Sequence, residues 1–172
     1  MAGAMSAPLI VTAELGGADL ALFDALRRRH FPPERNHLVA HLTMFHAIPA
    51  MLEPELKQRL AATAANAPPP TATVAGLMNL GGGVAYRIVS GDLEAIRDDL
   101  RDAFRGSLTQ QDSHGWRPHI TIQNKVAPKI ARALIAALEG TFTPRPLEIG
   151  GLAYHFYEGG PWRPGRRYAF RG

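Results

Sequence analysis

Two short segments of the chain carry residues of the types that transfer protons. Residues 41–44 read HLTM and residues 119–122 read HITI, so each segment is histidine, apolar, threonine, apolar. Alternate side chains of an extended strand point to opposite faces, which puts the histidine and threonine of each segment on one face and the apolar pair on the other. If the two segments face one cleft, that cleft holds two imidazoles and two hydroxyls.

Two imidazoles on opposite sides of a phosphorus atom can catalyse phosphoryl transfer. Imidazole has an unperturbed pKa of about 6.5, so it exchanges protons readily near neutral pH. A neutral ring can take a proton from the attacking water or hydroxyl, while a protonated ring gives one to the leaving oxygen. The hydroxyls of Thr43 and Thr121 can donate to non-bridging phosphate oxygens and stabilise the developing charge. No obvious carboxylate cluster adjoins His41 or His119, so we expect neither a metal ion nor another cofactor.

The segments around these motifs predict alternating strands and helices, bounded by glycine and proline. The expected strands cover residues 9–15, 38–45, 71–80, 84–90, 118–123, 146–157 and 166–170. The expected helices cover residues 19–30, 53–65, 92–105 and 128–139, with Asp19 and Asp92 as N-caps and Ile130, Leu134 and Leu138 facing inward. Residues 107–116 are polar and rich in turn-forming types, so we expect a surface loop there.

The order of these elements repeats along the chain. The first strands of the two halves begin at residues 9 and 84, and the helices that follow the two motifs begin at residues 53 and 128. The interval along the chain is the same for the two strands as for the two helices. Self-similarity at a fixed interval indicates two similar lobes. We therefore predict a single bilobal α+β domain over residues 1–172, with the motif strands facing a shared central cleft. Its approximate repeats would cover residues 9–80 and 84–157, followed by a final strand at 166–170.

Composition narrows the class of protein. Of the 172 residues, 46% are hydrophobic and 20% are charged, as in ordinary globular domains. The formal charge of +4 permits an anionic partner without requiring one. The absence of cysteine excludes disulfides, thiolate nucleophiles and cysteine-based zinc sites. No apolar run is long enough to span a membrane and no secretory signal precedes the first strand, so by elimination we expect a cytoplasmic protein without a membrane partner. We also expect a monomer.

The two motifs resemble those of the two-histidine (2H) phosphoesterase superfamily, in particular its bacterial 2′-5′ RNA ligase-like and RNA 2′,3′-cyclic phosphodiesterase branch. The resemblance rests on residues 41–44 and 118–122, each on an expected strand at an equivalent place in the repeat, and it extends over nearly the whole chain. It implies two pseudo-symmetric lobes of antiparallel sheet, with helices outside, around a basic cleft. It also implies metal-independent hydrolysis of a 2′,3′-cyclic phosphate at the end of RNA or on a small nucleotide.

The same resemblance implies roles for the motif residues. His41 would protonate the leaving oxygen and His119 would activate water, roles that exchange when the reaction runs in reverse. Thr43 and Thr121 would hold the phosphate. Arg117, just before the second motif, could face the phosphate or lie in a solvated loop.

The residues around the motifs leave some points open. His46 follows the first motif where relatives often have apolar residues, and it should point away from the cleft if the strand is regular. Trp116, Trp162 and Tyr157 could stack on nucleobases or simply pack. Two other functions are compatible with the motifs: reversible 2′-5′ joining of RNA halves, and non-catalytic binding of phosphorylated RNA ends.

Overall fold

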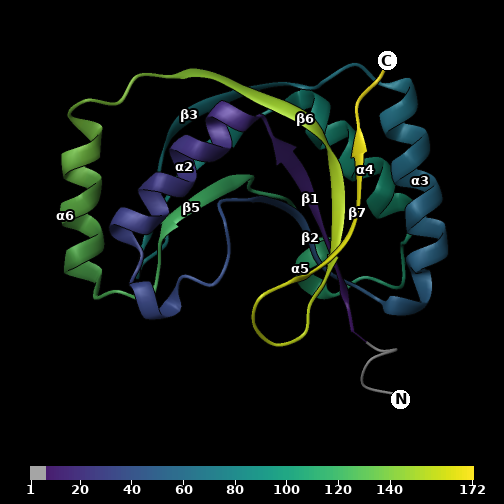
Figure 1. The fold of residues 1–172 in the computed structure, drawn as a ribbon, viewed down its shortest axis with the longest axis horizontal. Helices are drawn as coiled ribbons and strands as arrows, with labels where there is room; N and C mark the ends of the chain where they lie inside the picture. Colours follow the sequence, from purple (N-terminus) through teal and green to yellow (C-terminus); the bar gives the residue numbers. More distant parts are fainter. Residues whose placement is uncertain (1–6) are drawn as a thin grey trace.

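The computed structural model describes residues 7–172 and shows an antiparallel sheet with helices against it, so the fold class is α+β as predicted (Figure 1). The strands are β1 (Leu9–Leu15), β2 (Leu42–Ile48), β3 (Thr71–Asn79), β4 (Val84–Val89), β5 (His119–Gln123), β6 (Arg145–Phe156) and β7 (Arg163–Ala169). The α-helices are α2 (Gly17–His30), α3 (Glu53–Asn66), α4 (Gly91–Ala103), α5 (Gln110–Ser113) and α6 (Pro128–Glu139). Short 3-10 turns occupy Pro33–Arg35 and Ala50–Leu52. Within the described residues, none of the helices is long and apolar enough to cross a membrane.

The sheet brings together two strands that lie at its opposite ends. Along the hydrogen-bonded path the strand order is β2-β1-β6-β3-β4-β5, and β7 also pairs with β6. Although β2 and β5 end this path, they contact each other. The sheet must therefore curve strongly, and the long strand β6 arches over the molecule in Figure 1. This curvature places the two motif strands side by side.

The two halves of the chain exchange strands. β3, from the first half, pairs with β4, whereas β6, from the second half, pairs with β1. Through residues 145–148, β6 pairs with β3 before it reaches β1. Each lobe of sheet thus contains strands from both halves, and a single buried cluster of hydrophobic side chains runs through both lobes.

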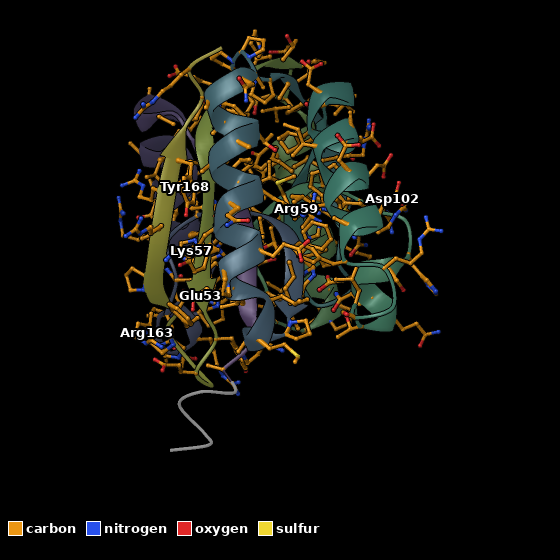
Figure 2. The ribbon with its side chains drawn as sticks, turned by 90° about the vertical axis from the view of Figure 1, so that its right-hand side faces the viewer. Glu53, Lys57, Arg59, Asp102, Arg163 and Tyr168 are labelled. Atoms are coloured by element: carbon orange, nitrogen blue, oxygen red, sulfur yellow. The ribbon has the colours of Figure 1, made fainter. Side chains whose placement is uncertain are left out.

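Helices lie at both ends of the long axis, with α6 at one end and α3 at the other (Figure 1). Leu56, Leu60 and Ala64 follow each other at four-residue spacing along α3, and all three are buried. Figure 2 shows α3 from outside, with Glu53 and Lys57 on its side towards β7. The hydroxyl of Tyr154 donates a hydrogen bond of 2.6 Å to Glu53, which ties α3 to β6.

The two aspartates predicted as N-caps have a different role. Because α2 and α4 each begin at a preceding glycine, Asp19 and Asp92 lie inside the first turn, and the prediction was wrong for both. Asp19 accepts a hydrogen bond of 2.8 Å from the backbone N–H of Glu148 in β6. Asp92 accepts one of 2.8 Å from the backbone N–H of Thr71 in β3. Each helix is therefore bonded to the third strand of the opposite half.

Other differences from the predicted elements are local. The first motif strand starts at Leu42 rather than at residue 38, so His41 directly precedes it. The predicted loop at 107–116 contains α5, whose four residues are too few to show a helical period. On α6, Ile130 is 48% exposed whereas Ala131 is fully buried, so the prediction that Ile130 faces inward was wrong. Leu134 and Leu138 are half-buried and pack against the core as predicted.

Candidate active site

The five residues predicted to be catalytic or to bind substrate all line one cleft. Its volume is about 350 Å³, and it contains residues of β2 and β5. His41 and Thr43 border it from the first motif, His119 and Thr121 from the second, and Arg117 from the segment before β5. The other lining residues are His46, Arg97, Gln111, Gly115, Trp116 and Trp162. The fold therefore brings the two imidazoles and the two hydroxyls to one place.

Both imidazoles are anchored in the same way. Nδ1 of His41 lies 2.8 Å from the carbonyl oxygen of Val39, and Nδ1 of His119 lies 2.7 Å from the carbonyl oxygen of Arg117. A carbonyl oxygen can only accept a hydrogen bond, so each Nδ1 carries the proton and donates it. In the neutral ring Nε2 then has a free lone pair, and this is the atom that can exchange protons with a ligand.

The environment of His41 favours the neutral ring. Burial lowers the pKa of His41 to about 4, although the hydrogen bond to a backbone carbonyl opposes this shift. Positive charge on Arg27, and on His155 and His119 when they are protonated, lowers it further. The ring of Trp162 packs against the imidazole with 4.7 Å between centroids. His41 is therefore neutral near pH 7, and an anion bound beside it would raise its pKa.

His46 lines the cleft, contrary to the prediction that it points away. The prediction assumed a regular strand, but the pairing of β2 with β1 shifts register between Leu9 and Val11 and again between Val11 and Thr12. Met44 and Phe45 are both fully buried, so the alternation of faces is interrupted between them. Because of this irregularity, the side chain of His46 lies on the face of β2 that borders the cleft.

A buried arginine supports the outer edge of β2. Arg97, on α4, is only 3% exposed and donates from Nε to the carbonyl of Met44 at 2.9 Å. Its other nitrogens donate to the carbonyls of Asp112 at 2.9 Å and of His114 at 3.2 Å. One guanidinium thus satisfies carbonyls of β2 and of the segment that leads to the second motif.

Asp112, on α5, bonds to the same stretch of β2. Its carboxylate accepts the backbone N–H of His46 at 2.8 Å and that of Ala47 at 2.8 Å. Burial alone would raise the pKa of Asp112, but the hydrogen bonds from His46 and Ala47 outweigh it and hold the pKa below its usual value. Asp112 is therefore charged in the folded protein, and it fixes α5 to β2.

The second motif strand has an equivalent support. Arg27, on α2, is 3% exposed and donates from Nη1 to the carbonyl of Thr121 at 2.9 Å. Its Nε donates to the side chain of Asn36 at 3.2 Å. Both motif strands are thus held by an arginine from a helix of the opposite half of the chain. Neither arginine was identified as a site residue from the sequence.

Both tryptophans contact the first motif. The indole N–H of Trp116 donates to the carbonyl of Thr43 at 3.0 Å, and Trp162 packs on His41 as described above. Tyr157, which the sequence grouped with them, is 46% exposed and does not line the cleft. Within residues 7–172, no three histidine, aspartate or glutamate side chains are grouped so that they could hold a metal ion.

Comparisons with known proteins agree with this architecture. A family model described as the 2′-5′ RNA ligase superfamily matches residues 17–161. Among solved structures, TT0787 of Thermus thermophilus aligns with a TM-score of 0.67 and 15% identity, over 96% of this chain and 98% of that one. A structure described as a phosphoesterase aligns with a TM-score of 0.63 and 20% identity, over 97% and 99% of the two chains.

The LigT protein of E. coli is a further structural neighbour. Its complex with 3′-AMP aligns with a TM-score of 0.61 and 19% identity, over 97% of this chain and 99% of that one. At these identities the solved structures show the fold alone. No protein with a curated description matches the chain.

Replacing Asp112 by alanine should destabilise the fold. The backbone N–H groups of His46 and Ala47 would lose their acceptor, and each unsatisfied buried group costs about 1–3 kcal/mol. We therefore expect the free energy of unfolding, measured by chemical denaturation, to fall by about 2–5 kcal/mol. Asp102→Ala removes an exposed carboxylate from α4 (Figure 2) and is the matched control, with an expected change of about 0.5 kcal/mol or less. Equal losses in the two variants would contradict the role given to Asp112.

The low pKa of His41 can be measured by NMR titration. We expect the Cε1 proton of His41 to titrate near pH 4 in the free protein, and inorganic phosphate to raise that midpoint. The unfolded chain has the ordinary value of 6.5, so between pH 6.5 and 4 the unfolded state binds more protons. The free energy of unfolding should therefore fall as the pH is lowered through this range, and less so in His41→Gln. A midpoint of 6 or above, on the ordinary scale for histidine, would show that the ring is not held neutral.

Proposed function

The chain belongs to the 2′-5′ RNA ligase superfamily, and from this premise we propose that it is a phosphoesterase that opens 2′,3′-cyclic phosphates of RNA ends or small nucleotides. The observation that carries the proposal is the pair of identically anchored imidazoles, His41 and His119, in one cleft with Thr43 and Thr121. Acid–base catalysis of phosphoryl transfer needs two such groups, each within about 3 Å of the oxygen that it serves.

In the proposed reaction a water molecule attacks the cyclic phosphorus. Nε2 of His119 takes a proton from the water as the new P–O bond forms. The bond from phosphorus to one ribose oxygen breaks, and Nε2 of His41 gives its proton to that oxygen. The product is a phosphomonoester with a free ribose hydroxyl, and the two imidazoles have exchanged protonation states. Thr43 and Thr121 donate to the non-bridging oxygens, where charge increases in the transition state.

The low pKa of His41 fits this order of events only if the substrate binds first. With the cleft empty His41 is neutral, so it has no Nε2 proton to donate. A phosphate anion beside the ring favours the imidazolium and raises the pKa. Binding of the substrate would thus take up the proton that His41 later gives to the leaving oxygen, and the acid would be charged only when a substrate is present.

The size of the cleft and one structural neighbour support a nucleotide ligand. A volume of about 350 Å³ lies in the range of small-molecule sites. The E. coli LigT neighbour has been crystallised with 3′-AMP, with ATP and with NADP+. We infer that the cleft of this chain receives the phosphate end of a nucleotide or of an RNA strand.

His41→Ala and His119→Ala should each lower kcat on a 2′,3′-cyclic nucleotide by about 100- to 10,000-fold, because each removes a proton-transfer group. Circular dichroism should show that both variants remain folded. His37→Ala, which removes an exposed histidine outside the cleft, is the matched control and should keep normal activity. Because the imidazoles need no metal, a chelator should leave activity intact. Normal turnover by either cleft variant would refute the proposal.

Joining can be separated from hydrolysis in the same preparation. Two RNA pieces are mixed, one ending in a cyclic phosphate and the other in a 5′-hydroxyl. We expect the cyclic phosphate to be opened to a monoester, and no longer RNA to form. A longer product that disappears in His119→Ala would instead assign 2′-5′ joining to the same two residues.

The direction of proton transfer can be tested with an activated leaving group. 4-Nitrophenolate leaves without needing a proton, so a phosphodiester that carries it does not require the general acid. If His41 is the acid, His41→Ala should lose far less activity on this substrate than on a cyclic nucleotide, whereas His119→Ala should lose activity on both. The reverse pattern would exchange the two roles and leave the reaction type unchanged.

A further inference from the structure

A second groove adjoins the active-site cleft. It has a volume of about 220 Å³ and shares Trp116 and Arg117 with the cleft. The other lining residues are Met78, Arg87, Ile88, Val89, Ser90, Glu94 and Pro118. The groove therefore adjoins the cleft, on a surface formed by β3, β4 and the segment that leads into β5, and a ligand longer than one nucleotide could reach from one to the other.

The register of the sheet places Arg87 beside His119. The two residues are direct partners in the antiparallel pairing of β4 with β5. Residues directly opposite each other in such a pair have side chains on the same face, with Cβ atoms roughly 4.5–5.5 Å apart. Arg87 therefore lies one strand away from the imidazole, on the face that carries His119 and Thr121.

The side chain of Arg87 lies over a glycine. Gly76 of β3 is the residue opposite Arg87 on its other side. A Cβ added at Gly76 would lie 3.6 Å from Nη2 of Arg87, so the guanidinium rests over the glycine. The guanidinium thus extends over β3 and lines the groove, although the residue as a whole is exposed.

The charge of the groove is not neutralised by ion pairs. Among residues 7–172, neither Arg87 nor Arg117 has a carboxylate oxygen within 4.0 Å of its guanidinium nitrogens. Glu94 is the acidic residue among those that line the groove. Both guanidinium groups line the groove, and guanidinium matches the geometry of phosphate oxygens in a bidentate manner.

We propose that this groove is a second phosphate subsite, in which Arg87, together with Arg117, binds the phosphate on the 5′ side of the terminal nucleoside of an RNA strand. The inference rests on the proposed function and deepens it. The cyclic phosphate occupies the cleft between the imidazoles, and the preceding phosphodiester lies in the groove. The substrate class is then an RNA end of at least two nucleotides rather than a cyclic mononucleotide.

The test compares a 2′,3′-cyclic mononucleotide with a dinucleotide that ends in a 2′,3′-cyclic phosphate. The wild-type protein should prefer the dinucleotide in kcat/KM. Arg87→Gln should reduce that preference by about tenfold, the scale of one charge-assisted hydrogen bond. It should also make the dependence of log kcat/KM on log salt concentration shallower by about 0.7 for the dinucleotide. Arg87→Lys, which keeps the charge, should restore part of the preference.

The control variant is Arg132→Gln, which removes the same charge from an exposed position on α6 that borders neither the cleft nor the groove. It should leave the preference unchanged. Equal kcat/KM for the two substrates in the wild type, or an equal loss on both substrates in Arg87→Gln, would overturn the second subsite and leave the proposed function standing.

Binding gives a readout that does not depend on turnover. A dinucleotide with a 3′-phosphate should bind more tightly than the corresponding 3′-mononucleotide by calorimetry, and Arg87→Gln should weaken the dinucleotide selectively. If the wild type turns over neither cyclic substrate, the proposed function fails and the calorimetry alone decides whether the subsite exists. Equal affinity of the dinucleotide for the wild type and for Arg87→Gln would overturn it.

Discussion

Each motif strand is held by a buried arginine that comes from a helix of the opposite half of the chain. Arg27 of α2 bonds to the carbonyl of Thr121 in β5, and Arg97 of α4 bonds to the carbonyl of Met44 in β2. β2 and β5 end the strand path, so the outer edge of each has backbone groups that no neighbouring strand pairs. The arginines supply donors to those edges. The position of one imidazole relative to the other depends on these two bonds, because they fix each motif strand to the opposite half.

Arginine suits this position better than an apolar residue would. A buried edge carbonyl needs a donor, and a planar guanidinium offers several at once, as in the three carbonyls bonded by Arg97. Burial lowers the pKa of Arg27 and of Arg97, yet an arginine stays charged at any physiological pH. The rings of Phe31 and Phe45 lie 4.4 and 4.8 Å from the respective guanidinium carbons. Since a buried charge is weak evidence for net stability, we attribute to these arginines the fixing of register rather than a large gain in folding energy.

The sequence predicted the parts of the fold that depend on periodicity, and it failed where a single residue changes a local pattern. The alternation of His41 with Leu42 and of His119 with Ile120 was enough to place the motif histidines away from the apolar core. One irregularity in β2 reversed the expected orientation of His46. Alternation cannot reveal such an irregularity, because the residues that form it are ordinary strand formers.

The arginines that support the motif strands were missed for another reason. Arg97 lies on the apolar face of its helix, between Leu93 and Leu100, and a charged residue within an apolar stripe was the available signal. Its partners lie far away along the chain.

The near-symmetry of the fold makes the difference between its two catalytic candidates informative. Both imidazoles are anchored identically, so their chemistry is set by what surrounds them rather than by how they are held. His41 lies under Trp162, which also packs on His155 with 5.2 Å between centroids, and burial keeps its ring neutral. His119 instead has Arg87 as its neighbour across the sheet. A long anionic ligand could extend from the side of the cleft that carries His119. The imidazole of His41, on the other side, would gain its proton only when the anion binds. Two rings that are anchored alike therefore lie in unlike surroundings.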